Sequence, residues 1–195
     1  MNSSRPRKAR HHHGNLRVVL IQAAYDHVRE HGVDSFSLRD ATREAGVTSA
    51  AAYRHFARRA DLLTEVVTRG FRELSAQMRD RVAETAGQGE PAGRGVRRVL
   101  AAGEAYVEFA RSEPHLFSLM FGPHGAAGRE AAGAADDLPS ASLQLREALS
   151  EAGAVGEPAF LHAWGLAHGL AGLAAAGIAD PQQVQEALEH FSAGV

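Results

Sequence analysis

Two short amphipathic segments with one glycine between them stand in the stretch Ser37-Leu-Arg-Asp-Ala-Thr-Arg-Glu-Ala-Gly-Val-Thr-Ser-Ala-Ala-Ala-Tyr-Arg-His-Phe56. Ser37 and Asp40 have the spacing of a capping box, which predicts that a helix begins there. Gly46 ends this helix, because a residue without a Cβ adopts the conformation of a tight turn without strain. Thr48 or Ser49 can cap a second helix that runs to Phe56. Two helices joined by such a turn form a helix-turn-helix pattern.

The apolar positions of this stretch predict how it packs. One set is expected to point inward, between and beneath the two helices: Leu38, Ala41, Ala45, Val47, Ala52 and Phe56. A preceding helix over residues 15–31 has apolar residues at spacings of three and four, and together with Phe36 it can cover the open side. The second helix of the pair is then free to place its N-terminal residues in a DNA major groove.

The same periodicity predicts helices along the rest of the chain, and no segment alternates like a strand. The expected helices cover residues 15–31, 37–45, 49–56, 59–82, 95–112, 114–121, 139–152, 157–178 and 180–193. The predicted fold class is therefore all-α with about nine helices. Its expected parts are a flexible basic arm (1–13), a three-helix helix-turn-helix head (14–60) and a helical-bundle body (61–195). The Gly/Ala-rich residues 122–137 show no apolar stripe and are expected to form a mobile loop.

Charge divides the chain in the same way. The 195 residues carry a net charge of -2, but residues 1–60 hold 11 basic and 5 acidic residues and so carry +6. The remaining residues hold 10 basic and 18 acidic residues and carry -8. A basic head on an acidic body favours a polyanionic partner. The alternative is a basic tail on an ordinary protein, because residues 5–10 alone supply +4.

Several classes of protein are excluded. The absence of cysteine excludes disulfides, thiolate metal sites and cysteine nucleophiles. No Ser/His/Asp spacing, phosphate-binding glycine loop or His-Glu-x-x-His element is present, so we expect no enzyme, no cofactor, no catalytic residue and no metal site. No apolar run reaches the roughly 18–20 residues of a membrane helix, and the N-terminus lacks a secretory signal. We therefore expect a cytoplasmic protein without membrane contact.

Residues 32–63 resemble the DNA-binding domain of TetR-family transcriptional regulators, most specifically in Tyr53-Arg-His-Phe56 with a basic residue three positions later. The His12-His-Gly-Asn-Leu-Arg17 segment resembles a lead-in found in part of that family. The resemblance implies base contacts from Ser49, Ala50, Ala51 and Arg54. It implies phosphate contacts from Arg39, Thr48, Tyr53, His55 and Arg59. Arg54 suits guanine, with a phosphate clamp as the alternative, and Tyr53 can instead be a core aromatic only.

The body carries two further matches. Residues 106–110 with 113–122, and the segment Ala163-Trp-Gly-Leu-Ala-His-Gly-Leu170, look like the Trp-His-Gly type of TetR ligand-binding domain. The resemblance implies a small-molecule pocket, for which the candidate residues are Tyr106, Phe109, Phe117, Met120, Phe121, Trp164 and His168. An aromatic stripe of this kind is also typical of an ordinary core, so a helix-turn-helix dimer without any ligand is the alternative.

Small residues mark one face of the helix expected over 157–178. Gly165, Gly169, Gly172 and Ala176 lie at i, i+4, i+7 and i+11, although each interior glycine costs about 1 kcal/mol relative to alanine. Such a face allows close approach of another helix. We expect a homodimer interface made by this face and by Val184, Leu188 and Phe191 of the last helix, with packing inside one subunit as the alternative.

Together these features predict a dimeric repressor that binds a palindromic double-stranded DNA operator and is released by an unidentified small-molecule effector.

Overall fold

The computed structural model describes residues 16–87, 93–133 and 140–194, and every regular element in them is helical. The described elements are α1 (Leu16–His31), α2 (Leu38–Glu44), α3 (Ser49–Tyr53), α4 (Arg59–Glu84), α5 (Arg94–Ser112), α6 (Pro114–Phe121), the 3-10 turn η2 (Pro123–Gly125), α7 (Ala126–Gly133), α8 (Ala141–Ala152), α9 (Glu157–Ala175) and α10 (Pro181–Ser192). The all-α prediction is confirmed. The expected basic arm lies outside the described residues. None of the described helices is long and apolar enough to cross a membrane.

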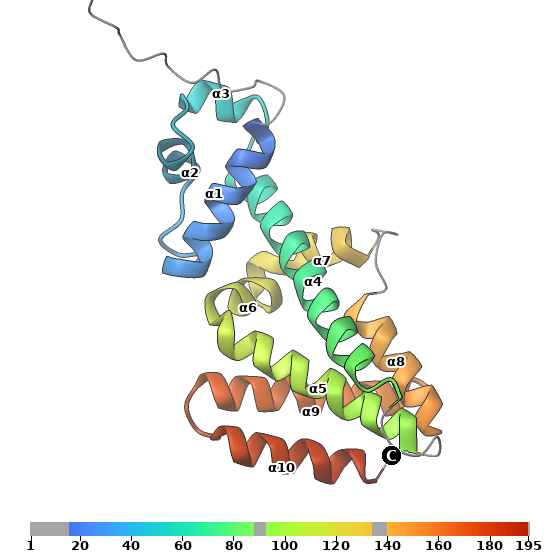
Figure 1. Cartoon of the computed structure of the whole chain (residues 1–195). Coiled ribbons are helices and arrows are strands. Elements are labelled where there is room, and N and C mark those ends of the chain that lie inside the picture. Colours follow the sequence, from blue (N-terminus) through green and yellow to red (C-terminus); the bar gives the residue numbers. More distant parts are fainter. Residues whose placement is uncertain (1–15, 88–92, 134–139, 195) are drawn as a thin grey trace, which may run out of the picture.

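Helices α1, α2 and α3 form a small head at one end of the molecule (Figure 1). Its core contains the residues expected to point inward, which are buried except for the half-buried Val47, and Ala41 and Ala52 are completely buried. Among the apolar residues of α1, Leu20 and Ala24 are also buried, whereas Val19 is 39% exposed. Tyr25 takes a buried place instead and donates a hydrogen bond from its hydroxyl to Glu73 of α4.

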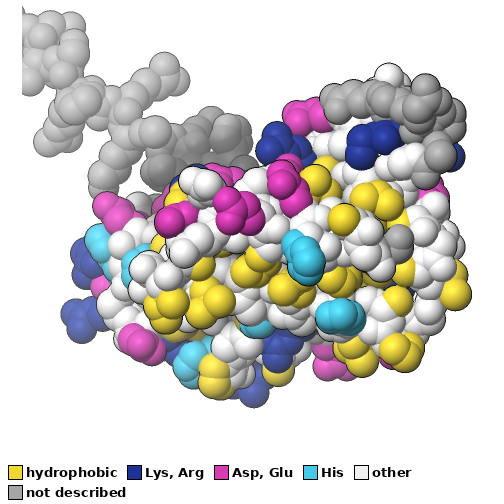
Figure 2. Space-filling view, turned by 90° about the horizontal axis from the view of Figure 1, so that it is seen from below, with side chains coloured by type: hydrophobic (Ala, Val, Ile, Leu, Met, Phe, Trp, Pro, Cys, Tyr) yellow, Lys and Arg dark blue, Asp and Glu magenta, His cyan; other side chains and the backbone are white. Residues whose placement is uncertain are grey.

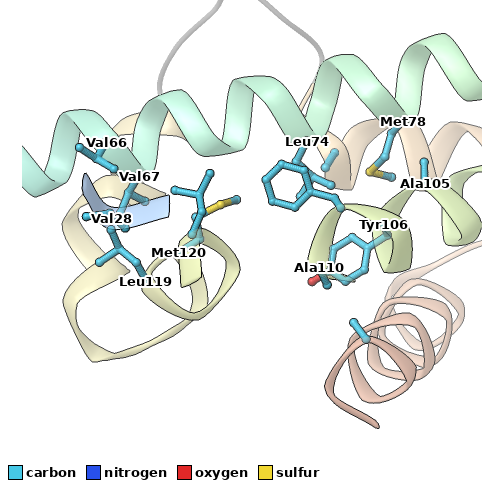
Figure 3. Close-up of a cluster of buried hydrophobic side chains, with 14 of the residues drawn as sticks. Val28, Val66, Val67, Leu74, Met78, Ala105, Tyr106, Ala110, Leu119 and Met120 are labelled. Carbon is cyan, nitrogen blue, oxygen red and sulfur yellow. The ribbon is translucent and has the colours of Figure 1, made fainter. Parts of the chain in front are cut away.

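Helix α4 connects the head to the body. It runs diagonally through the molecule from α3 to α8 (Figure 1). Helices α5, α6, α7 and α8 pack against it, whereas α9 and α10 pack on α5. One row of its side chains, including Val66, Val67, Leu74 and Met78, is buried along this whole length (Figure 3). Met120 of α6 meets the first part of this row and Tyr106 of α5 the second. Head and body therefore share one continuous hydrophobic core.

The prediction of a mobile loop over 122–137 is wrong for residues 123–133, which the structure describes as helical. Residues 123–125 form a 3-10 turn and residues 126–133 form α7, which packs on α4. A Cβ on Gly128 would lie 2.4 Å from Val67, so glycine allows the two helices to approach closely. Arg129 donates a hydrogen bond of 2.7 Å to the carbonyl of Met120. Close backbone packing holds this helix where the sequence offers no apolar stripe.

Helix α9 is shorter than predicted. It ends at Ala175, and Gly177 follows in the left-handed conformation with φ +68°. A glycine in this conformation just after the last turn is a common helix stop, because it carries no Cβ to strain. The prediction treated Gly177 as part of the helix, whereas the structure uses it to turn the chain into α10.

Candidate DNA-binding interface and effector cavity

Hydrogen bonds fix both ends of α2, including the turn that leads to α3. Ser37 caps α2 by accepting from the backbone N–H of Asp40, and the Asp40 carboxylate accepts from the backbone N–H of Ser37. The hydrogen bond that the Ser37 hydroxyl donates to this carboxylate holds the pKa of Asp40 below its usual range. At the other end, Gly46 has φ +65°, and the N–H of Val47 donates to the carbonyl of Thr42 at 3.0 Å. The pattern is a Schellman motif, which fixes the direction in which α3 leaves α2.

Helix α3 presents most of its residues to solvent. Only Ala52 is buried, and Thr48 caps the helix by accepting from the N–H of Ala51 at 3.3 Å. The side chain of Tyr53 is 59% exposed, so it does not serve the core. The other predicted DNA-contacting residues on this surface are exposed, except Ala51, which is half-buried: Arg39, Ser49, Ala50, Arg54 and His55.

Arg59 is placed differently from the other predicted phosphate contacts. Its guanidinium donates hydrogen bonds to two carbonyls within the head, that of Phe36 at 2.9 Å and that of Val33. Its side chain therefore joins the start of α4 to the segment between α1 and α2. The sequence pattern gave no sign of this internal role.

Helix α4 begins without a side-chain acceptor at its cap. Arg58 stands there, and the carboxylate of Asp61 accepts from its backbone N–H at 3.0 Å and from its guanidinium at 2.8 Å. The hydrogen bond from Arg58 lowers the pKa of Asp61. Asp61 thus supplies one of the two hydrogen bonds of a capping box, the one to the backbone N–H of the cap residue.

The head contacts the body through a second route besides α4. Arg29 of α1 donates two hydrogen bonds to the carboxylate of Glu113, which lies at the junction of α5 and α6. This pairing raises the pKa of Arg29. Beside it, the ring of His115 lies so close to Gly32 that a Cβ there would be 3.1 Å from its Nδ1. Neither Arg29 nor Glu113 was singled out in the sequence, because the two are 84 positions apart.

The predicted pocket residues lie close together in the body, but they form two groups. Rings of Tyr106, Phe117, Phe121, Trp164 and His168 form one aromatic cluster, with centroids 4.7 to 6.4 Å apart. Phe109 and Met120 are completely buried in the core beside it. The hydroxyl of Tyr106 and Nδ1 of His168 are hydrogen-bonded at 2.8 Å. Burial raises the pKa of Tyr106 and lowers that of His168, so both are neutral at pH 7.

A cavity of about 20 Å³ adjoins this cluster. Trp164 and Tyr106 form part of its wall, and the other lining residues come from α4, α5, α8, α9 and α10: Met78, Val99, Leu100, Ala102, Gly103, Leu145, Ala163, Leu166, Ala167, Leu188 and Phe191. The lining does not include five of the predicted pocket residues, namely Phe109, Phe117, Met120, Phe121 and His168. The sequence missed most of the wall because small and aliphatic residues at helical spacing look like any core.

The small-residue face of α9 is open in the subunit. A Cβ built on Gly165, Gly169 or Gly172 meets nothing within 4 Å, and Ala176 is exposed. Leu161, Leu173 and Ile178 add exposed apolar side chains to this part of the chain. Hydrophobic side chains gather over the underside of the body, which carries α10 (Figure 2). Packing of these glycines inside their own subunit is thereby excluded for the described residues.

The assignment of Val184 and Leu188 to a dimer interface is wrong. Both side chains are buried within the subunit, at 6% and 4% exposure, and Leu188 packs on Gly103 of α5. Phe191 is half-buried and meets the ring of His162 edge-on. The apolar stripe of α10 therefore closes the cavity, and only its other faces are available to a second subunit.

Two family models match the chain. Residues 20–66 match the bacterial regulatory proteins of the tetR family, and residues 99–194 match the tetracyclin repressor-like C-terminal domain. The chain belongs to the TetR family. It is therefore a TetR-like transcriptional regulator, with a DNA-binding head and a TetR-type C-terminal domain.

Solved structures agree with this fold. A protein of unknown function from Rhodococcus sp. RHA1 is 32% identical over 96% of both chains, with a TM-score of 0.73. The multidrug binding protein EbrR, solved with imidazole, is 20% identical over 97% of this TetR-family chain and 96% of its own, with a TM-score of 0.62. A transcriptional regulator from Rhodococcus sp. Rha1 is 23% identical, covers 92% and 95% of the two chains, and has a TM-score of 0.59. No curated protein matches the sequence.

Proposed function

We propose that this regulator is a dimeric repressor that binds a palindromic DNA operator and leaves it when a small molecule enters the body. The observation that carries the proposal is the outward surface of α3, a helix fixed by the Schellman turn: Tyr53 at its end and Arg54 and His55 just after it are exposed. A helix presented in this way fits the major groove, with Ser49, Ala50, Ala51 and Arg54 at base edges. The proposal involves no catalytic step and no cofactor, and its partner, a DNA operator, places its action in the cytoplasm.

Phosphate contacts are assigned to Arg39, Thr48, Tyr53 and His55. We assign Arg59 to bracing the head, because its guanidinium is already bound by two carbonyls. If each dimer neutralises about eight phosphates, the logarithm of affinity falls with the logarithm of salt concentration at a slope near -7. The acidic body adds repulsion from DNA away from the head.

The open face of α9 supports the dimer. Gly165, Gly169 and Gly172 would let a second subunit's helix approach closely, and two heads related by a two-fold axis would read half-sites about 34–36 Å apart or at a multiple of that distance. A ligand that expands the cavity would displace α6, whose Phe117 and Phe121 belong to the aromatic cluster. The Arg29–Glu113 pair would pass this movement to the head and change the separation of the two recognition helices.

Fluorescence anisotropy on a duplex from the promoter of its own gene tests the DNA-binding part. Arg54→Ala and Tyr53→Ala should each weaken sequence-specific binding by about 1–3 kcal/mol, while Arg79→Ala in the body serves as a matched control. Binding that is independent of sequence and unaffected by either head variant would refute the proposal.

A further inference from the structure

We propose that the effector is a compact, uncharged and mostly apolar molecule with one hydroxyl or carbonyl group, which the Tyr106–His168 pair recognises. The inference rests on the proposed function, since it names the class of molecule that would occupy the cavity. It comes from three properties of the described body: the apolar lining of the cavity, the lack of charged side chains in that lining, and the hydrogen bond that joins Tyr106 of the lining to His168.

The lining of the cavity favours a ligand with an apolar surface. All 13 lining side chains are aliphatic or aromatic, or a glycine, and the hydroxyl of Tyr106 and the indole N–H of Trp164 are the polar atoms among them. The present volume of about 20 Å³ corresponds to roughly one water molecule. A ligand therefore has to push side chains outward. The half-buried members of the lining are nearest to solvent: Leu100, Trp164, Leu166 and Phe191.

No charged side chain lines the cavity, and no charged residue of the described body is buried as a whole. Among the described residues of the body, the buried polar side chains are all uncharged: Thr68, Ser75, Gln144 and Ser192. Gln144 is already bound to the carbonyl of Ser75 at 2.9 Å. A carboxylate or an ammonium group brought into this core would lose its water without gaining a counter-ion. The site thus selects against both signs of charge.

The polar pair supplies one point of recognition. Tyr106 lines the cavity, and its hydroxyl is hydrogen-bonded to Nδ1 of His168. When the hydroxyl donates to Nδ1, its oxygen can still accept a hydrogen bond from a ligand hydroxyl, and turning the hydroxyl away lets it donate to a ligand carbonyl. Removal of this group should weaken a ligand modestly, while removal of the apolar wall should weaken it much more.

The single tryptophan makes the site directly observable. Trp164 is the only tryptophan in the 195 residues and lies in the cavity wall, so emission excited at 295 nm reports on this place alone. Three probes of nearly equal size and transparent at that wavelength form a charge series: cyclohexylmethanol, cyclohexanecarboxylate and cyclohexylmethylammonium. Titration of each into the full-length protein at pH 7.5 measures its dissociation constant.

We expect cyclohexylmethanol to change the emission of Trp164 and to bind at least about a hundredfold more tightly than either ion. Tyr106→Phe should weaken the alcohol by about five- to tenfold. Tyr25→Phe, which removes a hydroxyl from the head, is the matched control and should leave the titration unchanged. Gly103→Ala should also weaken binding, because its methyl group would lie 2.9 Å from Leu188 and fill the cavity.

Equal or tighter binding of either ion, or no response of Trp164 to any of the three probes, overturns the inference. The proposed function fails separately. If a charged compound releases the operator without displacing cyclohexylmethanol, the proposed repressor function stands and the uncharged ligand class is rejected. If cyclohexylmethanol binds at Trp164 but operator affinity does not change, the ligand class stands and the proposed release of DNA by ligand is rejected.

Discussion

Gly169→Leu should convert the regulator into a folded monomer. A Cβ at this position meets nothing within 4 Å in the subunit, so the new side chain fits without strain in the isolated chain. Leucine in a helix interior is favoured over glycine by about 0.8–1 kcal/mol, so the helix itself gains stability. In the dimer the same side chain would hold the two α9 helices apart, and we expect the dimer dissociation constant to rise at least a hundredfold, or about 2.7 kcal/mol.

Sedimentation velocity combined with thermal unfolding at several concentrations checks both halves of this prediction. The free energy of unfolding of a dimer rises by about 1.4 kcal/mol for each tenfold increase in protein concentration, so its melting temperature rises as well. The melting temperature of a monomer does not depend on concentration. The variant should therefore sediment as a monomer and show a constant melting temperature. Leu143→Glu, at an exposed position of α8, is the control and should stay dimeric. A Gly169→Leu protein that remains dimeric would refute the assignment of this face.

Three further changes test single contacts. Arg59→Met should lower the free energy of unfolding in urea by about 1.5–3 kcal/mol, since it removes charged hydrogen bonds to two carbonyls; lost DNA affinity without lost stability would instead show a phosphate contact. Gly32→Ala should cost about 1–2 kcal/mol, because φ is +78° and His115 is close, and an unchanged urea midpoint would contradict this. Burial lowers the pKa of His168 in the folded protein, so as the pH falls the unfolded chain takes up this proton at a higher pH than the folded chain does. The free energy of unfolding should therefore decrease as the pH falls below about 6.5. His168→Gln should remove this part of the pH dependence, and identical pH profiles for the two proteins would show that His168 does not cause it.

The head was predicted well because its features are local. A capping residue and its partner, a glycine at a turn and an apolar residue every three or four positions all lie within one or two turns of each other. Ser37, Asp40 and Gly46 therefore have the geometry that the sequence indicated.

The body was harder to predict, because its contacts join distant segments. The stripe of α10 was read correctly as apolar, but periodicity does not reveal which helix covers it, and Leu188 turned out to face α5. Helix α7 has no stripe at all and is held by the close approach of Gly128 to Val67. Arg59 looked like a free cation because its carbonyl partners, at Val33 and Phe36, are backbone atoms that leave no trace in the sequence.

The most direct test of the central claim is to select bound sequences from a random library of DNA duplexes with the full-length protein. A dimer that reads DNA with α3 of each subunit should enrich a two-fold symmetric consensus, with equivalent half-sites separated by one helical turn or a multiple of it. Its affinity should exceed that for random DNA by about a thousandfold or more at physiological salt. An unenriched pool, or a single half-site without symmetry, would contradict the claim.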